Sequence, residues 1–370
     1  MTPPRWNVSQ SEPLSSFLGI NIHYDRVKGI LTFDVEDKIK ALFEEREWLS
    51  GIGVRSVPMM PDTDVRKTLD IKPKERLEHF LEKLMDTKEY ASVVGAAIFI
   101  STACRPDIAQ AISRVSRAMH GPTELDAKHV ITLLQYLNHT RKVKLVFRRD
   151  HHPISSHLKS YADKDKDLLD LVWANQGPDI VGDQLMGMTD ADYANKLEKD
   201  LKATSGYVFF FRRNLICWKA KLQPIIAMST HEAELIAMHI ASQEAMWLRN
   251  VLCDFKAAIT GKSADTLYDD TEEANIHTSS LSPTRILGDN LGAIQTAANP
   301  VSSGRSKHID IRYLKMREYQ AQQRLIVKHI DGNKNPADLF TKPLPRPAFQ
   351  EYCRAIGLVS GTKELVNENL

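Results

Sequence analysis

A carboxylate on an apolar helix face is the first feature of this sequence that could do chemistry. Residues 228–238 predict the start of a helix, with Ser229 or Thr230 as N-cap and acids in the first turn. At about 100° per residue, Glu234 heads a row of apolar side chains on one face of the helix. The rest of the row is Met238, Ala241, Ala245 and Leu248. Burying a carboxylate costs free energy unless it has a partner. Glu232 lies about 200° around the helix, so we expect it to stay solvated.

Three further acids stand where a sheet could bring them to Glu234. Asp190 and Asp289 each end a short apolar segment that predicts a strand, and Asp338 lies in the first turn of a helix that begins at Pro336. Ligands of open α/β sheets bind just outside the carboxyl ends of strands. Like charges repel at short range, so four converging carboxylates indicate a bound cation. Oxygen-only ligands favour Mg²⁺, with Mn²⁺ as the alternative. Two such ions about 4 Å apart can activate a water and stabilise the leaving oxygen in phosphodiester cleavage.

Each of these acids, taken alone, also has a simpler explanation. Asp289 can cap the helix that follows it, and Asp338 can interact with the dipole of its own helix. Asp192 is typical of a solvated residue. A zinc-protease motif at His231 is excluded, because the residue four positions later is Leu235. The metal hypothesis therefore depends on the joint placement of the four acids.

The elements that must position these acids form an α/β pattern. From residue 184 the order is three strands, a helix, a strand, two helices, a strand and a helix that begins at Pro336. This order predicts a layered α/β domain over residues 184–345. Residues 255–282 are polar and acidic without periodicity, and we expect a flexible insertion there.

The preceding half of the chain predicts a different architecture. Residues 1–13 are expected to be a disordered leader. A β-hairpin with its turn at Lys28-Gly29, followed by a helix, is predicted over residues 14–50. The rest is divided into a linker, a helical region, a polar insertion, and a C-terminal helix and tail that follow the α/β domain. Their expected bounds are 51–71, 72–150, 151–183 and 346–370.

Composition limits the class of protein. The 370 residues carry a net charge of +2, so any nucleic-acid surface must be local. The four cysteines are scattered and form no Cys-x-x-Cys pair, which indicates neither a disulfide framework nor a zinc module. We find no signal-peptide pattern and no apolar run long enough for a membrane span, and we expect no membrane partner. These observations predict an intracellular protein.

Seven motifs in order carry a family resemblance. They are Thr189-Asp-Ala-Asp-Tyr-Ala194, Thr204-Ser-Gly-Tyr-Val-Phe209, Trp218, Ser229-Thr-His-Glu-Ala-Glu234, Gly288-Asp-Asn290, Lys307-His-Ile-Asp310 and Ala337-Asp-Leu-Phe-Thr-Lys-Pro343. Together they resemble the ribonuclease H domain of copia-type LTR retrotransposon Pol polyproteins. Upstream segments such as Arg105-Pro-Asp-Ile108 and Ser113-Arg-Val-Ser-Arg117 resemble the thumb and connection region of the same polyproteins.

The resemblance implies a fold, a function and a site. The fold is a ribonuclease H-like mixed sheet flanked by helices, preceded by a mainly helical thumb- and connection-like region with a small hairpin. The function is metal-dependent cleavage of the RNA strand of RNA–DNA hybrids, with Asp190, Glu234, Asp289 and Asp338 as ligands of two Mg²⁺ ions. The implied partners are the hybrid and a palm-bearing reverse transcriptase segment or the rest of the polyprotein. The implied location is the cytoplasm, including virus-like particles, or the nucleus.

The sequence departs from the family in three places that bear on activity. One is the pair of long polar segments, residues 151–183 and 255–282, which interrupt the usual compact spacing. The polymerase signature Tyr-x-Asp-Asp does not occur, so we expect no DNA synthesis from this chain. Many ribonucleases H keep a mobile His about ten residues before the last acid, whereas His329 is predicted to lie on a strand. The alternative function is therefore a catalytically silent, nucleic-acid-binding remnant of a retrotransposon.

A basic cluster is the predicted substrate contact. Between the last two predicted strands lie Arg305, Lys307, His308, Arg312 and Lys315. Such a strip can follow a phosphate backbone, and hybrid recognition depends on shape and 2′-hydroxyl groups more than on base edges. A solvated helix face remains the alternative. Trp218 can stack on nucleic acid or belong to the core.

Overall fold

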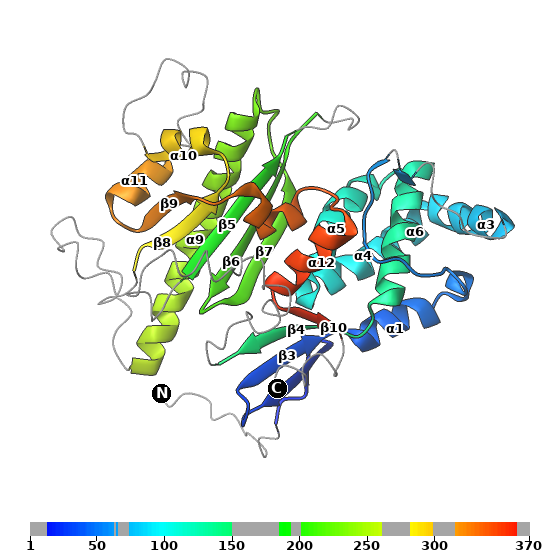
Figure 1. Cartoon of the computed structure of the whole chain (residues 1–370). Helices are drawn as coiled ribbons and strands as arrows, with labels where there is room; N and C mark the ends of the chain where they lie inside the picture. The colour runs from blue at the N-terminus through cyan, green and yellow to red at the C-terminus, as the bar shows by residue number, and fades with distance from the viewer. Residues whose placement is uncertain are drawn as a thin grey trace, which may run out of the picture.

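A computed structural model of the chain describes residues 13–62, 64–65, 74–149, 185–193, 201–260, 282–298 and 315–360. Two five-stranded sheets organise this part of the chain, each with its own set of helices (Figure 1). The insertion expected over residues 151–183, and the expected leader apart from its last residue, lie outside the described residues. Among the described helices, none is long and apolar enough to cross a membrane.

The first sheet is antiparallel and has the order β1-β2-β3-β4-β10. Its strands are β1 (Ser16–Phe17), β2 (Ile20–Asp25), β3 (Ile30–Asp34), β4 (Val143–Arg148) and β10 (Leu358–Ser360). Strands β2 and β3 are the predicted hairpin, and Gly29 takes φ +65° in its turn. Glycine suits this position because it adopts positive φ at little cost.

Helices stand beside this first sheet. Their bounds are α1 (Glu36–Glu44), α3 (Lys74–Met85), α4 (Thr87–Cys104), α5 (Ala109–Val115) and α6 (Glu124–His139), with short 3-10 turns η1 (Glu47–Leu49), η2 (Pro106–Ile108) and η3 (Ser116–Ala118). Local sequence explains several of their starts. Asp86 caps α4 by accepting from the backbone of Lys88, and Thr123 forms a reciprocal capping box with Asp126.

One segment of the region expected to be helical is a strand. Val143–Arg148, within residues 72–150, forms β4 and lies between β3 and β10. Its pairing partners lie far away in sequence, as in Leu31 opposite Phe147 and Val143 opposite Ser360. The expected C-terminal helix is α12 (Arg346–Ala355), and the strand β10 after it returns to the first sheet.

The second sheet is mixed and has the order β7-β6-β5-β8-β9. Its strands are β5 (Leu185–Asp192), β6 (Thr204–Phe211), β7 (Asn214–Leu222), β8 (Thr284–Gly288) and β9 (Leu325–His329). Strands β5, β6 and β7 pair antiparallel, whereas β8 and β9 run parallel to β5. This topology confirms the predicted α/β fold, a mixed sheet flanked by helices, and the predicted order of strands and helices from β5 to β9.

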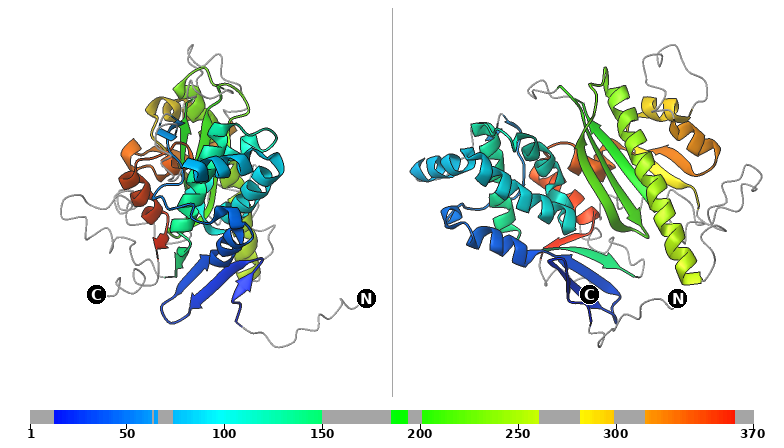
Figure 2. Two further views of the ribbon diagram at one scale, coloured as in Figure 1. Left: turned by 90° about the vertical axis from the view of Figure 1, so that its right-hand side faces the viewer. Right: turned by 180° about the vertical axis from the view of Figure 1, so that it is seen from behind.

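Helices cover both faces of the mixed sheet. On one face lie α9 (Thr230–Thr260), α10 (Leu291–Ala298) and α11 (Lys315–Ala321), and α9 crosses in front of the sheet in the rear view of Figure 2. Alternate strand residues divide between the faces, as Phe209 packs with α9 while Phe210 packs with the first half of the chain. Helix α9 continues to Thr260, so residues 255–260 of the expected flexible insertion (255–282) are helical, and Ala257 is buried there. Residues 261–281 lie outside the described residues.

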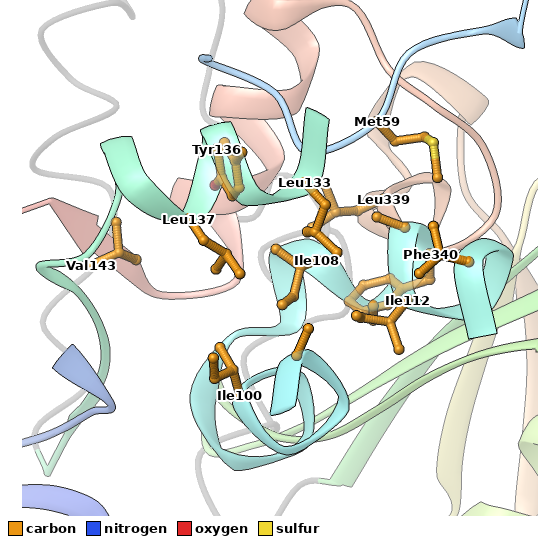
Figure 3. Close-up of a cluster of buried hydrophobic side chains, with 14 of the residues drawn as sticks. Met59, Ile100, Ile108, Ile112, Leu133, Tyr136, Leu137, Val143, Leu339 and Phe340 are labelled. Carbon is orange, nitrogen blue, oxygen red and sulfur yellow. The ribbon is translucent and has the colours of Figure 1, made fainter. Parts of the chain in front are cut away.

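The other face of the mixed sheet joins the two halves of the chain. After β9 come the 3-10 turns η7 (Gly332–Lys334) and η8 (Pro336–Phe340), the latter in place of the helix expected at Pro336. Leu339 and Phe340 of η8 belong to the same hydrophobic core as Ile108, Ile112 and Leu133 of the first half (Figure 3). The element that carries Asp338 is therefore held between the mixed sheet and the helices of residues 74–139.

Candidate metal centre

Three of the four predicted acids converge at one edge of the mixed sheet. Asp190, Glu234 and Asp289 each offer a carboxylate oxygen, and these oxygens lie within 4.8 Å of one another. Strands β5 and β8 run parallel, with Met188 opposite Leu287, so their carboxyl ends bring Asp190 and Asp289 together. Asp190 and Glu234 are buried, and Asp289 is half-buried. The group can hold a metal ion.

Glu234 enters this group from the start of α9. The apolar row predicted below it is buried, since Met238, Ala241 and Ala245 are fully inaccessible. The backbone N–H of Ala191 donates to Glu234 Oε1 at 3.4 Å, whereas Oε2 is buried and has no hydrogen-bond partner. An unsatisfied buried carboxylate oxygen is costly, and a cation between the acids satisfies it. This donor set fits a hard divalent ion.

The expectation that Glu232 stays solvated is wrong. Glu232 is buried, and its Oε2 accepts from the backbone N–H of Met228 at 2.7 Å. Its own N–H donates to Ser229 Oγ at 3.2 Å. This reciprocal arrangement resembles a capping box, in which both side chains satisfy free N–H groups at a helix start. Glu232 therefore fixes the start of α9 and lies outside the group of three acids.

The fourth acid approaches the group from η8. Asn335 caps this turn by accepting from Ala337 N at 3.1 Å, and its amide donates to Thr189 O at 2.9 Å. The first bond closes the start of η8, and the second fastens it to the strand residue before Asp190. Asp338 is buried and lies close enough to Asp190 and Asp289 for their charges to affect it.

Two side chains that follow Asp338 also belong to this site. The hydroxyl of Thr341 donates to Asp190 Oδ2. Lys342 Nζ lies 3.0 Å from Asp338 Oδ1 and 3.8 Å from Asp190 Oδ2. The sequence reasoning missed both residues. A local signal was present for Lys342, because residues four apart on a helical turn share a face.

The electrostatics of the group favour a bound cation. Burial, followed by the charges of Asp190 and Asp289, raises the pKa of Glu234 to about 9. Burial, then the charge of Asp190, raises the pKa of Asp338 to about 7 and that of Asp289 above its ordinary value. Carboxyl groups that resist ionisation together gain most from a counter-charge. The cluster is therefore suited to a divalent ion.

Of the five basic residues predicted to contact nucleic acid, one lies in the described part of the chain. Arg305, Lys307, His308 and Arg312 lie outside the described residues. Lys315 begins α11, is exposed, and forms an ion pair with Glu318. The role of Lys315 in nucleic-acid binding stays a prediction.

His329 and Trp218 are the two remaining ring-bearing residues singled out in the sequence. His329 is exposed at the end of β9, opposite Gly288. Burial and the charge of Asp190 raise the pKa of Asp289, and the charge of His329 acts in the opposite direction. His329 lies on the strand predicted for it. Trp218 is half-buried on β7 and packs against the main core, which favours the core interpretation.

Sequence comparison identifies the family. A 271-residue alignment, covering 73% of this chain, is 30% identical to the retrovirus-related Pol polyprotein from transposon TNT 1-94 of Nicotiana tabacum. A second relative, the retrovirus-related Pol polyprotein from transposon RE1 of Arabidopsis thaliana, is 28% identical over 96% of the chain. The chain belongs to the copia-type Pol polyproteins.

The chain spans a minor part of these retrotransposon polyproteins, since the alignments cover 16% and 20% of the two relatives. No protein-family model matches the sequence. Among solved structures, the N-terminal RNase H domain of a Mycobacterium tuberculosis protein, fused to maltose binding protein, has a TM-score of 0.29. It is 11% identical and aligns with 47% of this chain and 99% of the other.

Proposed function

We propose that this segment of a copia-type Pol polyprotein is a metal-dependent ribonuclease H that cuts the RNA strand of RNA–DNA hybrids. The observation that carries the proposal is the convergence of Asp190, Glu234 and Asp289 within 4.8 Å, with one oxygen of Glu234 buried and unpartnered. These acids come from a strand end, a helix start and a second strand end of a ribonuclease H-like sheet. Such an arrangement supports hydrolysis of a phosphodiester.

Each residue has a separate task in this proposal. Asp190, Glu234 and Asp289 would hold one divalent ion, and Asp338 would complete a second position with Asp190. Two bound Mg²⁺ or Mn²⁺ ions supply Lewis-acid activation of a water and stabilise the leaving oxygen. Thr341 orients the Asp190 carboxylate through its hydroxyl, and Asn335 fixes the turn that carries Asp338. The exposed imidazole of His329 is our candidate for carrying protons between the Asp289 side of the site and solvent.

A cleavage assay tests this function. The full chain is incubated with an RNA–DNA hybrid labelled on the RNA strand, in Mg²⁺ or Mn²⁺, with DNA duplex and RNA duplex as substrate controls. We expect cleavage of the hybrid alone, and a loss on the order of a hundredfold or more in Asp289→Asn, since the group acts electrostatically on the reacting phosphate. Asp331→Asn is the matched control, because Asp331 is an exposed acid paired with Lys334 at 3.2 Å.

The outcomes separate the enzyme from the remnant. No cleavage by folded protein, or unchanged cleavage in Asp289→Asn, would refute the nuclease. Salt-dependent binding of the hybrid without turnover would support the silent nucleic-acid-binding remnant. The predicted strip of Arg305, Lys307, His308, Arg312 and Lys315 supplies the charge for that binding, and its neutralisation is expected to flatten the salt dependence.

A further inference from the structure

An ammonium group already occupies one side of the acidic group. Lys342 Nζ lies 3.0 Å from Asp338 Oδ1 and 3.8 Å from Asp190 Oδ2, while its side chain keeps 37% of its surface exposed. Both carboxylates are nearly inaccessible, with side-chain exposures of 11% for Asp338 and 3% for Asp190. Among the described residues, these are the two acids within ion-pair distance of Lys342.

The four acids form two candidate metal positions, and the Lys342 ammonium lies at one of them. The other position lies between Asp190, Glu234 and Asp289. Among the described residues, no lysine or arginine is within ion-pair distance of Glu234 or Asp289. Glu234, which belongs to this position, has its Oε2 buried and without a hydrogen-bond partner. Between Asp190 and Asp338, in contrast, the positive charge is supplied by the chain. Asp190 is common to both positions.

We propose that Lys342 is a tethered cation that occupies the second metal position, so that the two divalent ions bind in sequence. The first ion binds at Asp190, Glu234 and Asp289. The second binds between Asp190 and Asp338 only after the Lys342 ammonium has moved away. This inference rests on the proposed function and adds an order of metal binding to it.

The chemistry of lysine suits such an exchange. Its ammonium is a compact point charge on a flexible four-carbon chain, so it can leave a carboxylate pair for water without a change in the backbone. The exposed part of the side chain shows that solvent reaches it. Lys342 is therefore a positioning residue, because it acts through the two carboxylates that it holds.

Metal titration of the full chain without substrate tests the proposal. Mn²⁺ binding is followed by the electron paramagnetic resonance signal of the free ion, and Mg²⁺ binding by calorimetry. In the unaltered protein we expect one ion to bind, and a second to bind at least about tenfold more weakly, a difference of about 1.4 kcal/mol. In Lys342→Gln we expect the ratio of the two dissociation constants, the gap between the two affinities, to fall by about tenfold.

Two further variants separate this effect from general electrostatics and from misfolding. Lys334→Gln removes an equal charge from an exposed pair nearby, and we expect the gap between the two affinities to be unchanged. Lys342→Arg keeps a fixed positive charge that can bind carboxylates through two N–H groups, so we expect the gap to be kept or widened. If Lys342→Gln does not fold, as judged by circular dichroism, Lys342→Arg still tests the proposal through the size of its affinity gap.

Each result has a definite meaning. Two ions of equal affinity in the unaltered protein would overturn the inference and leave the nuclease proposal standing. An unchanged gap in Lys342→Gln, or a narrower gap in Lys342→Arg, would also overturn it. Absence of any Mn²⁺ or Mg²⁺ binding by folded protein would instead refute the metal site itself, and with it the proposed function.

Discussion

Phe340 connects the stability of the first half of the chain to the geometry of the fourth acid. It lies two residues after Asp338 on η8, has no exposed surface, and packs in the core that contains Ile108 and Ile112 of the first half (Figure 3). Truncating a buried phenylalanine to alanine costs about 3–5 kcal/mol, through lost burial and the cavity left behind. Domains are stable by only about 5–15 kcal/mol, so we expect Phe340→Ala to fold with a much reduced margin.

A matched substitution separates this loss of stability from a specific effect on the site. Phe80 of α3 is equally buried in the same core, and it contacts Trp48 far from the acids in sequence. We expect Phe80→Ala to lower the free energy of unfolding by a similar amount. Only Phe340→Ala should also weaken the binding of the ion that needs Asp338, by about 10–100-fold, as is typical when residues supporting metal ligands are changed.

Chemical denaturation and Mn²⁺ titration, both at low temperature, measure the two effects separately. Denaturation curves with and without Mn²⁺ give the free energy of unfolding from their midpoints and slopes, and the titration gives the affinity of the folded protein. Equal Mn²⁺ affinities in Phe340→Ala and Phe80→Ala would refute the idea that the first half of the chain positions Asp338. A cost below about 1 kcal/mol for Phe340→Ala would contradict the burial argument.

Two further predictions concern buried charge. The pKa of Glu234 is raised from its ordinary 4.5 to about 9, so the metal-free folded state holds a proton that the unfolded chain releases, and stability falls as the pH rises through this window. Thermal denaturation in a chelator should therefore show Glu234→Gln stabilising the protein more at about pH 8 than at about pH 5; equal effects at both would count against it. Arg105 and Asp107 form a fully buried pair at 2.7 Å. Asp107→Asn leaves that guanidinium without a counter-charge and should cost about 3–5 kcal/mol in urea denaturation, while replacing both by apolar residues should recover much of it. A loss no larger than that of Asp331→Asn, which breaks an exposed pair, would refute this.

Much of the fold follows from local sequence patterns. The hairpin of β2 and β3, the order of elements from β5 to η8, and the apolar row of α9 all come from periodicity and turn residues within short windows. The four candidate acids follow from the same patterns, since a strand end or a helix start can be recognised locally. Their metal-binding role stays a prediction.

Two features missed from the sequence depend on the path of the backbone, which residue patterns do not show. Strand β4 forms because β3 and β10 pair with it, and its own sequence did not distinguish it from the preceding helices. The burial of Glu232 follows from the bend that brings the backbone of Met228 onto its carboxylate.

Local residue patterns identify the available acids and the elements that carry them. How these acids share charge depends on tertiary packing. Lys342 lies beside Asp190, and Thr341 donates to it, because η8 packs between the mixed sheet and the first half of the chain. Coulomb interactions fall with distance and depend on burial, and neither quantity is encoded in residue spacing along the chain.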